Sequence, residues 1–356
     1  MNDPSAIRAF LRAHCARYPA LTLQDVCKAL YQSAFGCEHL IADPSAAADF
    51  IRAEAEGSRD RASEQVEPLC GDYCRVHLGI LRDGLRAETL SRLFALSARH
   101  EELGRETLEA MLRVLQEMAG ALELPFSARE TAETVEKWRQ DDFAPLHHSE
   151  AFRERYAPAY RVLRRDFARA LPLISRIDRL TAEKARVLVA VEGGSASGKT
   201  TLGALLQSVY DCPVFHMDDF FLRPEQRTEE RFAEPGGNVD RERFLSEVLL
   251  PLREGKCVDY RRFDCATFTI APPERIELGR LGIIEGAYSM HPDLAPYYDL
   301  SVFLDIPAEK QRGRILKRNA PAHAQRFFDR WIPLEQRYFD ALDVKGRCGL
   351  VLSADD

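Results

Sequence analysis

The sequence predicts two domains: a mainly α-helical domain over residues 1–183, and an α/β domain over residues 184–356 that contains a mainly parallel sheet flanked by helices. Three observations predict this fold class. The length of 356 residues is enough for about two domains, at roughly 150 residues each. Apolar residues recur at helical spacing through the first half. In the second half, short runs of apolar and β-branched residues alternate with helical segments, which is typical of a parallel sheet buried on both faces.

Helical segments dominate the first domain, because its apolar residues recur three and four positions apart. One of these segments begins after the N-cap candidate Asp43 and ends at Gly57. Only YCRVHLGIL, residues 73–81, looks like a strand. The predicted helices cover residues 4–19, 21–35, 43–57, about 86–100, 105–120, 127–140 and 156–183.

Five short apolar runs in the second domain predict five core strands. Helical segments such as residues 239–255 separate them, so right-handed crossovers would make the strands parallel and place ligands at their carboxyl ends. The predicted strands are residues 187–191, 213–217, 281–286, 300–306 and 349–353.

Composition argues against several classes of function. No apolar run approaches the roughly 20 residues that span a bilayer, and the first residues form an amphipathic pattern without a signal-peptide core, so we expect no membrane partner. Nine scattered cysteines suit reduced thiols in a cytoplasmic protein. The formal net charge is −7 and neither half has a basic excess, so we expect no nucleic-acid partner. Self-association into a homo-oligomer is left open.

A glycine-rich turn carries the strongest chemical signal. Residues 193–200, GGSASGKT, match the pattern G-x-x-x-x-G-K-[ST] between a predicted strand and a predicted helix. Backbone N–H groups of such a turn converge on a polyphosphate, Lys199 would reach the β- and γ-phosphates, and the Thr200 hydroxyl would ligate Mg²⁺. The alternative is a tight turn with an exposed lysine. We predict ATP and Mg²⁺ as cofactors, with these nucleotide-binding residues: Gly193, Gly194, Ser195, Ala196, Ser197, Gly198, Lys199, Thr200 and Thr201.

Carboxylates follow two of the other predicted strands. Asp218 and Asp219 come after the second strand, and Glu285 ends the third, so all three would lie at the sheet edge that carries the glycine-rich turn. One aspartate could accept a proton from an attacking hydroxyl while the other holds metal-bound water, and Glu285 fits a water-mediated Mg²⁺ contact. We take Thr200, Asp218 and Glu285 as the metal-binding candidates. The alternatives are a helix N-cap pair and a simple strand-end acid.

Six segments occur in an order that resembles the uridine kinase, phosphoribulokinase and pantothenate kinase group of P-loop kinases. They are EGGSASGKTT, MDDFF, EPGGNVDRERF, YRRFD, IIEGAY and QRGRILKRN, and the resemblance covers about residues 186–356. It implies a P-loop NTPase-type sheet, with Asp218 as the catalytic base and Glu285 as the acid after the third strand. Lys199 is assigned to catalysis together with these two acids.

The resemblance also implies a mobile lid that bears arginines and closes over the phosphates. Guanidinium groups on a closing helix neutralise the charge on a transferring phosphoryl group and exclude water. Arg312, Arg314 and Arg318 are the candidates, with Arg318 assigned to catalysis and Arg314 to nucleotide binding. The alternative is a solvated charged helix.

The acceptor side departs from the pattern of uridine kinases, which carry Tyr-Asp-Phe and a nearby histidine. This chain has Tyr260, Arg261 and Arg262 at that place, and two arginines suggest an acceptor with an acidic or phosphorylated end. One arginine could instead pair with Asp259 or Asp264. The predicted substrate-binding residues are Asp219, Tyr260, Arg261 and Arg262.

Four further charged residues are candidates for the acceptor side. Arg223, Arg227 and Arg231 recur every four residues, and they either line the acceptor cleft or form a solvated face beside glutamates. Asp240 resembles a helix-capping acid near the acceptor site.

Two functions fit these residues. The first is an ATP-dependent kinase that transfers the γ-phosphoryl group to a hydroxyl of a small molecule such as a nucleoside, sugar or other alcohol. The alternative is a nucleotide-binding regulatory module in which ATP binding or hydrolysis switches the helical domain. Asp218 and Arg318 favour the kinase, because a pure switch needs no base on the acceptor side.

A zinc site in the first domain is a separate hypothesis. Cys70, Cys74 and His77 lie close in sequence, with Cys37 and His39 upstream. The paired C-x₂-C units of structural zinc sites are missing, so we expect small thiols in a core.

Overall fold

The computed structural model describes residues 3–36, 44–57, 64–97 and 101–354. The chain divides into two compact units, Met1–Leu171 and Pro172–Asp356. This division falls inside helix α8 (Arg165–Glu183). The sequence analysis placed the domain boundary at the end of this segment, after residue 183. The apolar periodicity of α8 runs on past Pro172 without a break, which gives no local sign of the division.

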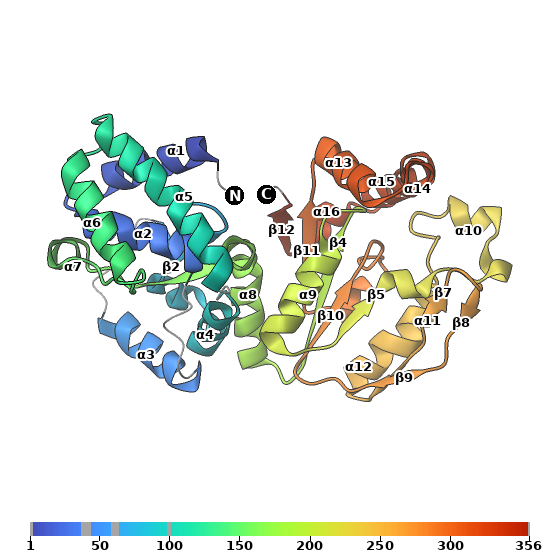
Figure 1. Ribbon diagram of the computed structural model, residues 1–356. Helices are drawn as coiled ribbons and strands as arrows, with labels where there is room; N and C mark the ends of the chain where they lie inside the picture. Colours follow the sequence, from blue (N-terminus) through green and yellow to red (C-terminus); the bar gives the residue numbers. More distant parts are fainter. Residues whose placement is uncertain (1–2, 37–43, 58–63, 98–100, 355–356) are drawn as a thin grey trace. The chain divides into compact units, whose positions relative to one another are not determined.

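Helices make up most of the first unit (Figure 1), which confirms the prediction of a mainly helical N-terminal part. They pack their apolar faces into one main core, with Leu30, Leu112 and Leu115 fully buried. The helices that precede α8 are α1 (Pro4–Arg17), α2 (Leu23–Phe35), α3 (Pro44–Gly57), α4 (Ala87–Leu96), α5 (Glu101–Gly120), α6 (Ala128–Gln140) and α7 (Glu150–Tyr156).

A small antiparallel sheet in this unit was predicted only in part. Its order is β1 (Val66–Pro68), β2 (Tyr73–His77) and β3 (Tyr160–Arg164). The predicted strand at residues 73–81 stops at His77, where a 3₁₀ turn begins. The prediction of helix from residue 156 was wrong for β3, because this segment pairs with β2, a partner far away in the sequence. Local periodicity does not reveal a pairing partner that is distant in the sequence.

Buried charges lie beside the core of the first unit. Arg75 is fully buried, and its guanidinium donates to Glu67 at 3.2 Å and to Gln32 at 2.9 Å. His14 Nδ1 lies 3.6 Å from the same Glu67 carboxylate. Farther along, His148 Nδ1 contacts Asp25 at 3.0 Å. Since an unpaired charge in such a place is costly, these pairs should make the unit sensitive to pH.

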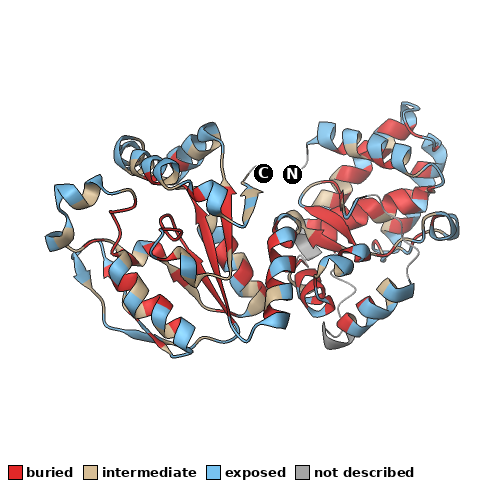
Figure 2. Cartoon of the chain, turned by 180° about the vertical axis from the view of Figure 1, so that it is seen from behind, coloured by how far each residue is buried: buried red, intermediate tan, exposed pale blue. Residues whose placement is uncertain are grey.

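The second unit contains a five-stranded parallel sheet, which confirms the predicted α/β fold. Figure 2 shows its central strands as buried. All five strands fall where the sequence analysis placed them. The sheet order is β12 (Leu350–Ser353), β11 (Leu300–Asp305), β4 (Val187–Gly193), β10 (Leu281–Glu285) and β5 (Val214–His216).

Helices and short hairpins complete the second unit. Helix α9 (Lys199–Tyr210) packs along the sheet beside β4, β10 and β5 (Figure 1). Two small antiparallel pairs, which were not predicted, follow the predicted helical segment 239–255; they are β6 (Val258–Tyr260) with β9 (Glu274–Ile276), and β7 (Phe263–Asp264) with β8 (Thr269–Ile270). The other helices are α10 (Glu229–Ala233), α11 (Arg241–Phe244), α12 (Leu250–Glu254), α13 (Ala308–Arg318), α14 (Pro321–Arg326), α15 (Ile332–Ala341) and α16 (Val344–Arg347).

Within the described residues, no helix is both long enough and apolar enough to cross a bilayer.

Candidate active site

The glycine loop, residues 193–200, connects the central strand β4 to helix α9. Gly193 has φ +148°, and a Cβ there would lie 2.7 Å from the Leu304 carbonyl oxygen, so a side chain has no room. Gly198 has φ +103° and forms the N-cap of α9. The loop therefore brings its backbone to the positive end of a 12-residue helix, where an anion is favoured.

Polar groups of the loop suit a polyphosphate. The ammonium group of Lys199 donates to the Gly194 carbonyl at 2.9 Å, so the lysine folds back over the loop. The hydroxyl of Ser197 is buried and has no hydrogen-bond partner in the described part of the chain. A buried hydroxyl without a partner is costly unless a ligand satisfies it. The residues present thus fit a bound phosphate group.

Glu285 connects the loop to the neighbouring strands. It ends β10, is 5 % exposed, and accepts hydrogen bonds from the Thr200 hydroxyl at 3.2 and 3.3 Å. Its Oε1 also lies 2.5 Å from His216 Nδ1 at the end of β5, and this hydrogen bond raises the pKa of His216. The sequence analysis did not single out His216, although it stands directly before the Met-Asp-Asp segment.

Asp218 lies in a 3₁₀ turn (Met217–Phe220) directly after β5. Its side chain reaches solvent, yet the surrounding protein desolvates the carboxylate, which raises its pKa. The nearby charge of Glu285 raises it further, and the charge of Lys199 lowers it. Lys199 and Glu285 therefore both lie within electrostatic range of Asp218, the predicted base.

Asp219 and Tyr260 form a separate pair. The Tyr260 hydroxyl donates to Asp219 Oδ2 at 2.7 Å and accepts from the His216 backbone N–H at 3.0 Å. Tyr260 is 1 % exposed. Because its hydroxyl is already engaged, Tyr260 holds Asp219 in place, and the role of either residue in binding a substrate stays a prediction.

The adjacent arginines pair with carboxylates other than the ones considered from the sequence. Arg261 forms an ion pair with Glu247. Arg262 lies 3.5 Å from Asp219 and 3.3 Å from Glu274. Asp259 and Asp264 were therefore the wrong partners, but each arginine does contact a carboxylate.

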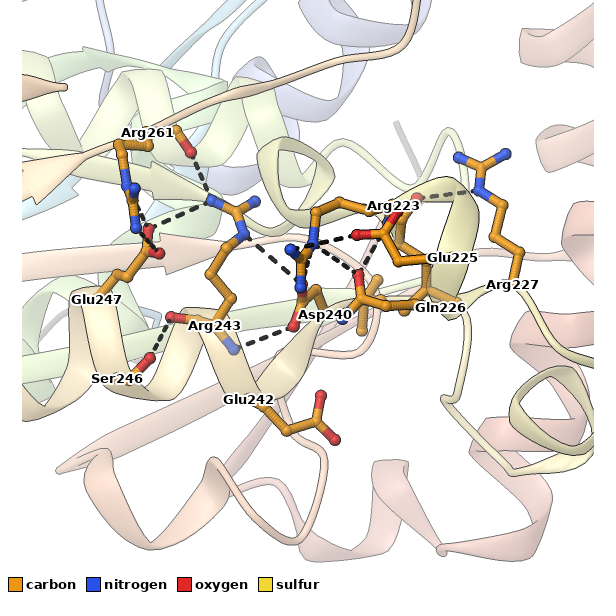
Figure 3. A network of polar contacts seen from close by, with 12 residues as sticks. Arg223, Glu225, Gln226, Arg227, Asp240, Glu242, Arg243, Ser246, Glu247 and Arg261 are labelled. Carbon is orange, nitrogen blue, oxygen red and sulfur yellow. Dashed lines mark hydrogen bonds and ion pairs between the residues drawn. The ribbon is translucent and has the colours of Figure 1, made fainter. Parts of the chain in front are cut away.

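Arg243 fixes the backbone next to Arg261 (Figure 3) and was missed from the sequence. Its guanidinium donates to the Asp219 carbonyl at 2.9 Å and to the Arg261 carbonyl at 2.8 Å, and it lies 4.0 Å from the centre of the Phe220 ring. Asp240 caps helix α11 by accepting from the Arg243 N–H at 3.1 Å, as expected of a capping acid. Arg243 stands beside Arg241 and Glu242 in the sequence, and nothing local distinguishes it from these charged neighbours.

The three arginines at residues 223–231 do not share one environment. Arg231 pairs with Glu242 and donates to two carbonyls of the following turn, whereas Arg223 pairs with Glu225. Arg227 lies 4.8 Å from the centre of the Phe268 ring. Neither a common acceptor-facing row nor a fully solvated face describes them.

Helix α13 carries the predicted lid arginines. Arg314 Nη1 donates to the carbonyls of Ala196 and Ser197 at 3.2 and 3.4 Å, so this arginine reaches the glycine loop. Arg312 and Arg318 lie over the rings of Phe328 and Phe327, at 4.5 and 6.0 Å. None of the contacts described for these two residues reaches the loop. The catalytic assignment of Arg318 stays a prediction that requires movement of this segment.

Two buried glutamates touch the glycine loop and were also missed. Glu335 of α15 accepts from the Ser195 N–H at 2.9 Å and from the Ser195 hydroxyl at 2.6 Å, and burial raises its pKa. Glu192 is fully buried, accepts from the Gly193 N–H at 2.8 Å and from the Tyr338 hydroxyl at 3.1 Å, and burial raises its pKa to about 7. The local sequence did mark Glu192, because an acid at the end of an otherwise apolar strand is unusual. Nothing in the local sequence marked Glu335.

The hypothesis of a metal site in the first unit finds no support in the described residues. Cys70 and Cys74 are buried, and burial raises the pKa of both thiols. Cys37 and His39 lie outside the described residues. In the described part of the chain, no three His, Cys, Asp or Glu side chains are arranged to hold a metal ion by themselves. A Mg²⁺ ion in the second unit would therefore take part of its coordination from phosphate oxygens and water, as this ion ordinarily does.

Comparisons with curated proteins cover parts of the chain. A uridine kinase of Chloroflexus aurantiacus is 32% identical over 143 residues, which span 37% of this chain and 68% of that protein. Uridine kinase-like protein 4 of Arabidopsis thaliana is 29% identical over 141 residues, 37% of this chain and 30% of that protein. The bifunctional alpha-galactosidase/sucrose kinase AgaSK of Mediterraneibacter gnavus is 30% identical over 194 residues, 48% of this chain. The chain spans only 30% and 20% of the last two proteins.

No family model matches the chain. Among solved structures, a possible uridine kinase from Bacillus stearothermophilus aligns with 23% identity and a TM-score of 0.39, over 51% of this chain and 99% of that chain.

Proposed function

Because this chain belongs to the uridine kinase family of P-loop kinases, we propose that it transfers the γ-phosphoryl group of ATP to a hydroxyl of a small molecule. The observation that carries the proposal is that Glu285 bonds both to Thr200, next to Lys199 in the glycine loop, and to His216, two residues before Asp218. A lysine of the glycine loop binds the phosphate end of a nucleotide, and a carboxylate within range of that lysine can serve the attacking hydroxyl.

ATP would be held by the glycine loop and by the positive end of α9. Backbone N–H groups of the loop, the Ser197 hydroxyl and the Lys199 ammonium group supply donors for the phosphate oxygens. Arg314, which already donates to the loop carbonyls of Ala196 and Ser197, adds a guanidinium group next to the loop. Mg²⁺ fits beside Thr200 and Glu285, where it would neutralise phosphate charge during transfer.

Asp218 is the proposed general base. The residue is exposed at the end of β5, and the raised pKa of its desolvated carboxylate increases its ability to take a proton. Asp219 is a weaker candidate, since Tyr260 already donates to one of its oxygens. Most of the catalysis would come from positioning and charge neutralisation, with base assistance contributing about 10²- to 10⁴-fold.

We further propose an uncharged acceptor with several hydroxyl groups. The sequence suggested an acidic or phosphorylated acceptor, because Arg261 and Arg262 are adjacent. Both guanidinium groups are paired with carboxylates, so the acceptor side offers little free positive charge from these two residues. Asp219 Oδ2 already accepts from the Tyr260 hydroxyl, which leaves Asp219 Oδ1 and the Asp218 carboxylate for a substrate. Carboxylate oxygens accept hydrogen bonds from hydroxyl groups and repel anions.

The test is ADP formation from Mg·ATP in the presence of nucleosides, free sugars, polyols and sugar phosphates. The proposal predicts that one or more uncharged compounds increase ADP formation, and that sugar phosphates do not. A rate that no acceptor changes would favour the regulatory module. That alternative has less support, because it leaves the carboxylate at Asp218 without a role.

A further inference from the structure

Ser195 of the glycine loop has all three of its polar groups bound by two later helices. Its N–H and hydroxyl donate to the two carboxylate oxygens of Glu335 on α15, at 2.9 and 2.6 Å. Its carbonyl accepts from Gln311 Nε2 on α13 at 2.9 Å. A Cβ on Gly194 would lie 2.9 Å from Gln311 Nε2 and 3.5 Å from Glu335 Oε2, so both side chains pack tightly on the loop.

The Glu335 carboxylate lies within the electrostatic field of the reacting groups. It is 6 % exposed, so burial raises its pKa. The charge of Lys199 favours its ionised form, while the charge of Asp218 opposes it. Glu335 therefore interacts electrostatically with both the lysine that would bind the phosphates and the proposed base.

A carboxylate and a phosphate group compete for the same kind of donor. Both are anions that accept strong hydrogen bonds from backbone N–H and hydroxyl groups. The N–H of Ser195 belongs to the loop that would cradle the nucleotide. A buried negative charge there also repels a triphosphate more than it repels a diphosphate, since the triphosphate carries a further charged group.

We propose that Glu335 is a specificity residue that lowers the affinity for nucleoside triphosphate by competing with the terminal phosphate for the donors of Ser195, an inference that rests on the proposed function. Glu335 leaves Ser195 when the triphosphate binds. Helix α14 and the turn at residues 327–331 connect α15 to α13, which bears Arg312, Arg314 and Arg318, so this displacement moves that segment as well.

Tyr338 gives this movement a fixed point. It lies one turn after Glu335 on α15, is fully buried, and donates to Glu192 at 3.1 Å. Glu192 is in turn held by the N–H groups of Gly193 and Met290. Rotation about this anchored turn would carry the start of α15, which Trp331 directly precedes, farther than its end.

The test compares E335Q with D340N. Glutamine keeps the size of the side chain and an acceptor for the Ser195 N–H, but it removes the charge. Asp340 lies on the same helix and is exposed, so D340N removes a charge away from the loop. Calorimetry with Mg²⁺ and a non-hydrolysable ATP analogue should show roughly tenfold tighter binding to E335Q, with a smaller gain for ADP and none for D340N.

A second measurement follows the position of the segment. In a W138F background, fluorescence reports on Trp331, whose ring lies 6.4 Å from that of Phe221. We expect the emission of E335Q without nucleotide to shift toward that of the unsubstituted protein with the triphosphate analogue bound. Thermal unfolding of each variant checks that it is folded.

Two outcomes would overturn this inference. Equal or weaker binding of the triphosphate analogue by folded E335Q would make Glu335 a brace that stays in place. A selective gain for ADP would place the competition at another phosphate. If the unsubstituted protein binds neither nucleotide, the proposed function itself fails, which is a different result.

Discussion

The hydroxyl of Thr200 donates to both carboxylate oxygens of Glu285, at 3.2 and 3.3 Å, and joins the first turn of α9 to the end of β10. The same carboxylate contacts His216 at the end of β5. One buried acid thus connects the glycine loop with two strands of the parallel sheet. A Mg²⁺ ion bound by Thr200 would come directly next to it.

Removal of the Glu285 charge should weaken Mg²⁺ binding. We expect E285Q to need about 10- to 100-fold more Mg²⁺ for half-maximal ATP turnover, since a carboxylate beside the ion orients its ligands. A Mg²⁺ titration at fixed ATP measures this. E277Q is the control, because Glu277 is exposed. An unchanged Mg²⁺ requirement in E285Q would remove Glu285 from the metal site.

Substitution of the two adjacent aspartates should separate their roles. D218N should lower kcat by about 10²- to 10⁴-fold and leave nucleotide affinity nearly unchanged, because only the base is lost. D219N should act mainly on KM for the acceptor, since Asp219 is held by Tyr260. Steady-state kinetics with ATP and acceptor varied in turn distinguish these effects. The reverse pattern would make Asp219 the base.

Arg243 should support the acceptor side without touching ATP. R243K keeps the positive charge but loses the fork that binds the carbonyls of Asp219 and Arg261. We expect a higher KM for the acceptor, an unchanged KM for ATP, and a loss of about 1–3 kcal/mol in the free energy of unfolding, because two partly buried carbonyls lose donors. R280K at an exposed site is the control. Equal effects on both KM values would contradict this role.

The buried histidines of the first unit predict acid sensitivity. Burial lowers the pKa of His14 to about 3 and that of His148 to about 4, against 6.5 in an unfolded chain. The unfolded state therefore binds more protons as the pH falls from about 6.5 toward 4, and stability drops by up to about 1.4 kcal/mol per pH unit for each histidine. Glu67 adds a loss only at lower pH. Hydrogen bonding to His77 and the charge of Arg75 outweigh burial and lower its pKa to about 2.

Urea unfolding of a W331F variant, followed by Trp138 fluorescence at pH values from 7.5 to 4.5, measures this dependence. Trp138 lies in the core of the first unit and reports on that unit. Stability that stays constant down to pH 4.5 would show that the two histidines are not buried as neutral groups.

Local sequence patterns predicted most of the second unit. Each core strand is a compact apolar run, and the glycine loop has fixed residues between a strand and a helix, so neighbouring residues carry the signal. The place of Asp218 and Glu285 followed from the rule that parallel strands end at one edge of the sheet. These predictions needed no knowledge of distant contacts.

Residues whose place depends on distant partners were not predicted. Strand β3 exists because β2 lies beside it, and Glu335 matters because α15 brings it to Ser195 from 140 positions away. Arg243 looked like one charge among several on a helix. The partners predicted for Arg261 and Arg262 were wrong for the same reason, because the folded chain, and not the local sequence, brings Glu247 and Glu274 next to them.

The most direct test of phosphoryl transfer is a mass-spectrometric screen of small hydroxyl compounds incubated with the protein and Mg·ATP. The account predicts that at least one uncharged compound gains the mass of one phosphoryl group, and that D218N forms almost none of this product while still binding ATP. Hydrolysis of ATP without any phosphorylated compound, at the same rate with every acceptor and in D218N, would contradict it.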